Sequence, residues 1–179
     1  RHLQPAMEAL IRLREAHGLT EDDVEAIEVE TYAIAARHAV AGWDDMASAQ
    51  LSFPYGLALA LKFGRADLVH YDDATRQAGW VASIAAKVSI RATPEMDALY
   101  PAQRPARVTV SGRAGRFTAF APEALGCREM PLGDAALSDK ALGLMAPALG
   151  GARARMLLDR LWRLDEADDC ASLFDGMVA

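Results

Sequence analysis

Apolar residues recur at helical spacing in several stretches of the chain. Residues 5–17 form one such stretch, and Gly18 directly after it fits a helix end. Residues 52–63 are apolar almost all round, which indicates a buried helix, and Ser52 fits its N-cap. Further helices are predicted over residues 74–86, 134–149 and 152–164, with a last short helix over residues 165–177.

Other stretches alternate between apolar and polar residues, which is the pattern of a half-buried strand. In the clearest of them, residues 24–32, Ile27 and Glu28 begin an alternation in which the two kinds of side chain fall on opposite sides. The sequence SGRAG at residues 111–115 has the composition of a hairpin turn. Shorter alternating strands are predicted at residues 88–91, 107–110 and 117–120.

This order of helices and strands predicts an α+β fold. We expect two layers, in which a mostly antiparallel sheet of about four strands carries helices packed mainly on one face. The chain has 179 residues and contains no internal repeat and no composition that marks a linker. A single domain over residues 1–179 is therefore expected.

Charge and composition narrow the classes of partner. Acidic residues exceed basic ones by 25 to 19, and the net charge of −6 weighs against nucleic acid, which requires a basic face. The longest apolar run, residues 51–61, stops at Lys62 and is too short to cross a membrane. No signal-peptide pattern opens the chain, and Cys127 and Cys170 do not make a disulfide framework. A cytoplasmic location is the expectation.

The residues that could bind a metal or a cofactor do not fall into any known pattern. The spacing of the four histidines fits no metal site, and three of them, His17, His38 and His70, are interpreted as surface or helix-end residues. No phosphate-binding loop, dinucleotide fingerprint or nucleophile elbow is present in the sequence. Neither a metal nor a cofactor is predicted.

One segment is a candidate for chemistry, the sequence AQLSFPY at residues 49–55. It places Tyr55 in the first turn of the predicted buried helix, where a phenol hydroxyl needs a hydrogen-bond partner. The free amides at a helix start also attract anions. Tyr55 is therefore either a structural tyrosine or a proton donor to a bound carboxylate, and the residues alone leave both open.

Several stretches in order along the chain together resemble the C-terminal domain of the MmgE/PrpD family. This family includes 2-methylcitrate dehydratases, cis-aconitate decarboxylases and iminodisuccinate epimerases. The segment at residues 49–55 carries the strongest part of the resemblance. The other matching stretches are Arg1 with His2, Pro5 with Ala6, residues 13–19, residues 24–31, residues 105–110 and residues 161–164.

The resemblance implies an active site that lies between a large helical N-terminal domain, which this chain does not contain, and an α+β domain. It implies that Tyr55 lines the site as a catalytic residue, with Ser52 from the same segment and His2 as substrate-binding residues. A histidine is common in the family where this chain has Gln4. The family chemistry is cofactor-free: a base removes a proton next to a carboxylate while an acid assists loss of water or carbon dioxide.

We therefore expect the chain to form one wall of a lyase site for a small di- or tricarboxylate and to be inactive alone. Because the chain starts at Arg1 without methionine, a fragment is expected, whose partners are the helical domain and further copies of itself. This hypothesis requires the phenol of Tyr55 to lie near an opening. The alternative is a free-standing, non-catalytic module for oligomerisation or carboxylate binding; a third option is a split enzyme.

Overall fold

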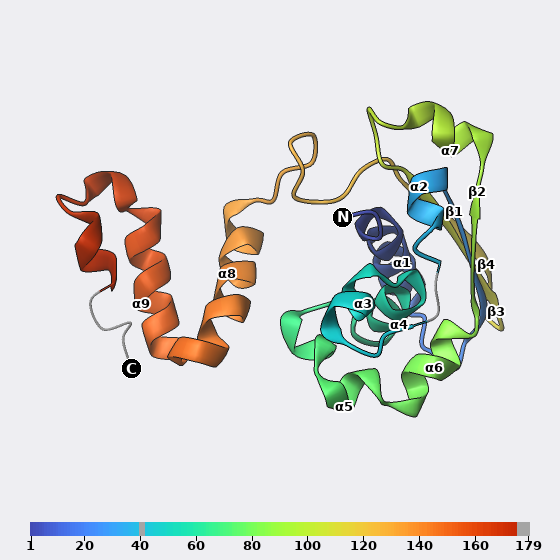
Figure 1. The fold of residues 1–179 in the computed structure, drawn as a ribbon, viewed down its shortest axis with the longest axis horizontal. Helices are drawn as coiled ribbons and strands as arrows, with labels where there is room; N and C mark the ends of the chain where they lie inside the picture. The colour runs from blue at the N-terminus through green and yellow to red at the C-terminus, as the bar shows by residue number, and fades with distance from the viewer. Residues whose placement is uncertain (40–41, 175–179) are drawn as a thin grey trace. The chain divides into compact units, whose positions relative to one another are not determined.

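The structure is a computed structural model that describes residues 1–39 and 42–174. The chain divides into two compact units, Arg1–Pro131 and Leu132–Ala179 (Figure 1). The first unit holds the sheet and all the predicted site residues. The second unit is built from helices and is described separately below.

The first unit contains a four-stranded sheet in the order β2-β1-β3-β4. β1 pairs antiparallel with β3, and β3 pairs antiparallel with β4, through the predicted tight hairpin. β2 instead runs parallel to β1, because the chain between them crosses over through several helices. The strand bounds are β1 Val24–Thr31, β2 Val88–Ala92, β3 Ala106–Gly112 and β4 Gly115–Ala121.

The two faces of this sheet differ sharply in chemistry. Along β1, Ile27 and Val29 are buried on one face. On the opposite face Glu28 pairs with Arg116 at 3.1 Å and Glu30 pairs with Arg107 at 2.7 Å. This alternation confirms the predicted strand, and it leaves one face for helices and the other for charged side chains.

The helix α1 (Gln4–His17) covers the apolar face, where it packs against β3, β4 and the helix α4 (Phe53–Phe63) (Figure 1). It ends at Gly18, whose φ of 61° lets its N–H bond the carbonyl of Arg14. These contacts confirm the α+β fold with a mostly antiparallel sheet and helices mainly on one face.

The helix α4 forms the centre of the core. Every side chain from Phe53 to Leu61 is buried, as its apolar sequence predicts. The Ser52 hydroxyl accepts the N–H of Tyr55 at 3.3 Å, which confirms the predicted N-cap. The Phe53 N–H donates to the carbonyl of His38 at 3.1 Å, so the helix start is joined to the chain that follows α2 (Ala33–Ala36).

The connecting segments differ from the prediction in four places. The helix expected over residues 74–86 is two short helices, α5 (Asp73–Arg76) and α6 (Gly79–Ala85), because Ala78 between them is extended. The segment between β2 and β3, for which no element was predicted, contains the helix α7 (Pro94–Leu99), which Thr93 caps. Two further elements were not predicted: the helix α3 (Met46–Leu51) and the 3-10 turn η1 (Leu68–Tyr71).

The second unit is a helical hairpin of α8 (Asp134–Leu149) and α9 (Gly151–Trp162), broken at Gly150 as predicted. The expected terminal helix over residues 165–177 is instead two 3-10 turns, η2 (Leu164–Glu166) and η3 (Cys170–Phe174), and residues 175–177 lie outside the described range. Among the described side chains of this unit, only Ala154 and Leu173 are buried.

Large apolar side chains are exposed along the hairpin. They are Leu137, Leu144, Met156, Leu161, Trp162 and Leu164. No helix in the described part of the chain combines the length and the apolar character needed to cross a membrane.

Candidate functional site

Tyr55, the predicted catalytic residue, lies in the first turn of α4 and is fully buried. Its hydroxyl donates to the carbonyl of His70 at 2.6 Å. The rings of Trp43 and Tyr71 lie 5.9 Å and 5.5 Å from its own. Burial, with a smaller contribution from Tyr71, raises the pKa of Tyr55 to about 12. The phenol is thus neutral, satisfied and closed off from solvent.

A single arginine holds the segment that covers Tyr55. Arg76 donates from Nε to the carbonyl of Tyr71 and from Nη1 to the carbonyl of Trp43, each at 3.2 Å. The indole N–H of Trp43 returns a bond to the Arg76 carbonyl at 3.0 Å. These contacts fix η1 and α5 over the phenol, which is the physical reason that Tyr55 does not lie at an opening here.

Ser52 is 2% exposed, and its oxygen accepts the backbone N–H of Tyr55. In this position the hydroxyl stabilises the helix start. Ser52 therefore sets the orientation of the first turn that carries Tyr55. No observation tests a contact between Ser52 and a ligand, and its substrate-binding role stays a prediction.

His2 lies in a different environment, half-buried beside the end of β1. Its Nδ1 is 2.5 Å from the hydroxyl of Tyr32, and its ring stacks on that of His38 with centroids 5.4 Å apart and an interplanar angle of 19°. Tyr32 is fully buried, which raises its pKa to about 12. The phenol therefore keeps its proton at neutral pH and can donate it to the neutral imidazole.

Charged groups surround this pair of histidines. Arg104 bonds Glu123 at 3.3 Å, and Arg1 lies 3.9 Å from the same carboxylate, which is only 4% exposed. The ring of Tyr100 stacks on Tyr32 at 4.6 Å. We call the whole group the His2 cluster, and its members are Arg1, His2, Tyr32, His38, Tyr100, Arg104 and Glu123.

The electrostatics of the His2 cluster oppose a further positive charge. Burial lowers the pKa of His2, and the neighbouring groups of His38 and Arg104 lower it further. Hydrogen-bond donors therefore gather at a half-buried place that carries more positive than negative groups. Such a place suits a carboxylate better than it suits a cation.

Backbone contacts bring the His2 cluster to the start of α4. The carbonyl of His38 accepts the Phe53 N–H, one residue from Ser52. From the other side Leu3 and Met7 lie so close to Gly56 that an added Cβ there would be 3.3 Å and 3.0 Å from them. The structure thus places two predicted residues, His2 and Ser52, at one end of α4, whereas the Tyr55 hydroxyl is bonded to the segment that follows the helix.

Sequence reasoning found only His2 among the members of the His2 cluster. His38 was interpreted as a surface or helix-end histidine, and no local pattern pointed to Tyr32, Arg104 or Glu123. Tyr32 directly follows β1, Arg104 comes two residues before β3 and Glu123 two residues after β4, and these strand ends lie at the same end of the sheet. These residues could be predicted to lie together only once the pairing of the strands is known.

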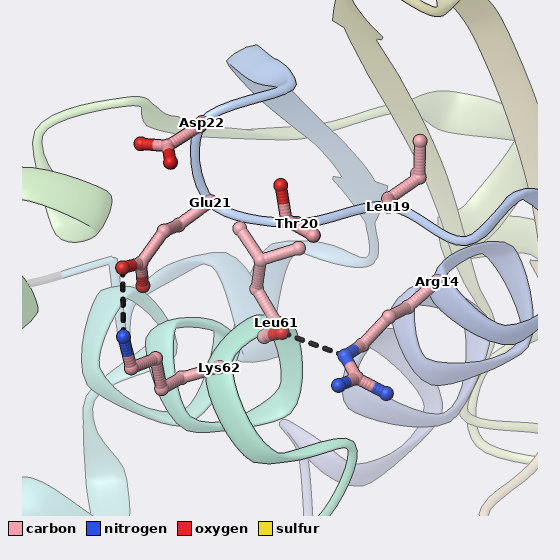
Figure 2. A pocket seen from close by; sticks show the side chains of 7 residues that line it. All are labelled: Arg14, Leu19, Thr20, Glu21, Asp22, Leu61 and Lys62. Carbon is pink, nitrogen blue, oxygen red and sulfur yellow. Dashed lines mark hydrogen bonds and ion pairs between the residues drawn. The ribbon is translucent and has the colours of Figure 1, made fainter.

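A pocket of about 280 Å³ opens elsewhere, beside the C-terminal ends of α1 and α4, and Figure 2 shows its lining. Lys62 bonds Glu21 at 2.7 Å, and Arg14 donates from Nε to the carbonyl of Leu61 at 2.8 Å. None of the predicted site residues lines it. Its full lining is Arg14, Leu19, Thr20, Glu21, Asp22, Leu61 and Lys62.

The donor sets in the described residues give no metal centre. No group of three or more histidine, cysteine, aspartate or glutamate side chains within residues 1–39 and 42–174 is arranged to hold an ion. Cys127 is buried and Cys170 is exposed, and both are free thiols.

Comparison with known families gives one match. Residues 1–165 match the family model described as MmgE/PrpD C-terminal domain. The match spans the whole first unit and the whole α8–α9 hairpin. No curated protein matches the chain significantly.

Proposed function

The chain belongs to the MmgE/PrpD family through its C-terminal domain, and from this premise we propose that it forms one wall of a lyase active site. The family is generally lyase-like and its C-terminal domain dehydratase-like. The proposed substrate is a small di- or tricarboxylate such as 2-methylcitrate or cis-aconitate. The match over residues 1–165 is the observation that carries this proposal.

The chemistry of the His2 cluster supports a carboxylate ligand. Its half-buried imidazoles and its guanidinium groups are donors, and the backbone of His38 contacts the N-terminal end of α4, which favours negative charge. In a lyase of this kind the carbanion formed next to a carboxylate is the charge that needs stabilising. We therefore assign His2 to substrate binding.

Tyr55 is assigned the role of proton donor, in a state that differs from the closed one. Its hydroxyl bonds the carbonyl of His70, so it can reach a substrate only when η1 moves away. The Arg76 contacts are the ones that must loosen for this movement. Ser52 would then hold the first turn of α4 in place while the cover opens.

The catalytic base is assigned to a helical domain outside this sequence. The exposed apolar side chains of the α8–α9 hairpin support such a partner, because a two-helix hairpin with so few buried residues gains little stability alone. A second copy of the chain is a further proposed partner of the assembled protein.

Turnover measurements test this function directly. The chain should not consume 2-methylcitrate or cis-aconitate by itself, and it should do so when produced together with its helical domain. His2→Gln should reduce kcat/KM in the assembled protein, and His17→Gln is the matched control because His17 stacks on Phe117, away from the cluster. Turnover by the chain alone would show that it contains a complete active site, which would refute the need for a helical domain. An assembled protein that binds tricarboxylates without turnover would identify the non-catalytic module.

A further inference from the structure

We propose that the His2 cluster takes up at most one proton from solvent when it binds a carboxylate group, and that His2 and His38 share this proton. The choice of ligand class rests on the proposed function. The coupling between ligand and proton rests on the geometry of the cluster. It makes the affinity of the site depend on pH within the physiological range.

The ligand-free cluster holds an excess of positive charge before either imidazole is protonated. Two guanidinium groups, those of Arg1 and Arg104, face the single carboxylate of Glu123. That carboxylate is also occupied, because its second oxygen accepts the N–H of Ala124 at 3.2 Å. The carboxylate of Glu129 also interacts with Arg1, but Arg128 accompanies it, so the field at the His2 ring remains unfavourable to protonation.

A bound carboxylate reverses this field. Its negative charge cancels the excess on the arginines, and its oxygens accept the N–H groups of an imidazolium more strongly than those of a neutral ring. Protonation and ligand binding therefore favour each other, and by linkage each strengthens the other to the same extent.

The stacking of the rings limits uptake to one proton. With centroids 5.4 Å apart, an imidazolium on one ring opposes the same charge on the other. Tyr32 keeps His2 in place in both states, since its hydroxyl can donate to the neutral Nδ1 and its oxygen can accept from the protonated one. Tyr32 is in this sense a positioning residue, and Tyr100 supports it by stacking.

The expected size of the effect follows from the size of the shift. If the ligand raises the pKa of His2 by about one unit, affinity rises at most about tenfold as the pH falls through both pKa values, and about fivefold between about pH 8 and about pH 6. A monocarboxylate should show the same coupling at lower affinity, because it supplies the same single group to the cluster.

The experiment titrates the full chain with tricarballylate, a tricarboxylate without a leaving group, and with acetate. Calorimetry in two buffers that differ in ionisation enthalpy counts the protons taken up, and NMR follows the C2 protons of all four histidines. We expect an uptake of at most about half a proton for a pKa rise of about one unit, and ligand-dependent changes in the C2 resonances of His2 and His38 alone. His17 and His70 serve as internal controls within the same spectra.

Variants separate the contributions. His38→Gln should lower the uptake while His17→Gln leaves it unchanged, and Arg104→Gln should weaken tricarballylate binding at both pH values. Circular dichroism checks that each variant keeps the fold.

Equal affinity at both pH values without buffer-dependent heat would refute the coupling and leave the lyase proposal standing. Coupled binding in a protein whose assembled form shows no turnover would refute the lyase proposal alone. If millimolar tricarballylate moves neither His2 nor His38, the proposed site is refuted.

Discussion

Replacing Tyr55 by phenylalanine separates its structural role from its catalytic one. The variant keeps the ring that packs against Trp43 and Tyr71 and removes only the hydroxyl that donates to the His70 carbonyl. The stability of the variant chain therefore measures the contribution of this hydrogen bond. The activity of the variant in the assembled protein measures the contribution of the hydroxyl as a proton donor.

The stability effect can be worked out from the closed structure. A buried neutral hydrogen bond contributes about 1 kcal/mol, and a carbonyl left without its donor adds a penalty, so we expect a loss of about 1–2 kcal/mol. For a protein of this size that corresponds to a fall in Tm of about 3–6 °C. Urea denaturation followed by tryptophan fluorescence measures it, because Trp43 and Trp80 lie near the two ends of α4.

Tyr71→Phe is the matched control. Its ring lies 5.5 Å from that of Tyr55, and within the described residues its hydroxyl makes no hydrogen bond, so its removal should cost little stability. In the assembled protein, loss of a general acid at position 55 should lower kcat about 100-fold or more, whereas Tyr71→Phe should not. A Tyr55→Phe protein that is destabilised as expected but turns over at the control rate would refute the catalytic role. Unchanged stability would refute the bond to His70.

Three further outcomes test the architecture. Ser52→Ala should destabilise the chain by about 1 kcal/mol through loss of the α4 cap, measured by urea denaturation, and an unchanged midpoint would contradict the cap. Burial raises the pKa of Tyr32 and Tyr55 to about 12, above an unfolded value of about 10, so the unfolded chain releases these protons first. Stability should be complete below about pH 10 and fall as pH rises toward 12, with phenolate absorbance appearing only as the chain unfolds. A chain ending at Pro131 should keep cooperative unfolding, whereas a peptide beginning at Leu132 should show little helix by circular dichroism; a stable isolated hairpin would contradict the need for a partner.

The sequence predicts most of the fold because its main signals are local. The alternation around Ile27 and the all-round apolar character of residues 52–63 depend only on neighbours in the chain, and both elements form where expected. The break at Ala78 was not predicted because a single glycine, Gly79, is tolerated within a helical pattern, whereas in the structure Ala78 is extended and α6 starts at Gly79 and packs on α4.

The site is predicted less well because its determinants are distant in sequence. Tyr55 is closed off by Arg76, whose bonds to Trp43 join residues 33 positions apart. The contact of His2 with Tyr32 spans 30 positions, and nothing near either residue indicates it. The family resemblance supplied Tyr55, Ser52 and His2, but the closed state and the second histidine come from the three-dimensional arrangement alone.

The His2 cluster forms only when several distant parts of the first unit are packed together. Its members come from before α1, after β1, before β3 and after β4, so they span positions 1 to 123 and share no single element. A partly assembled chain in which β4 has not yet joined β3 would hold the histidine pair but not Glu123, and the two arginines would repel each other there. Pairing of β4 with β3 therefore supplies the carboxylate that offsets the charge of the two arginines.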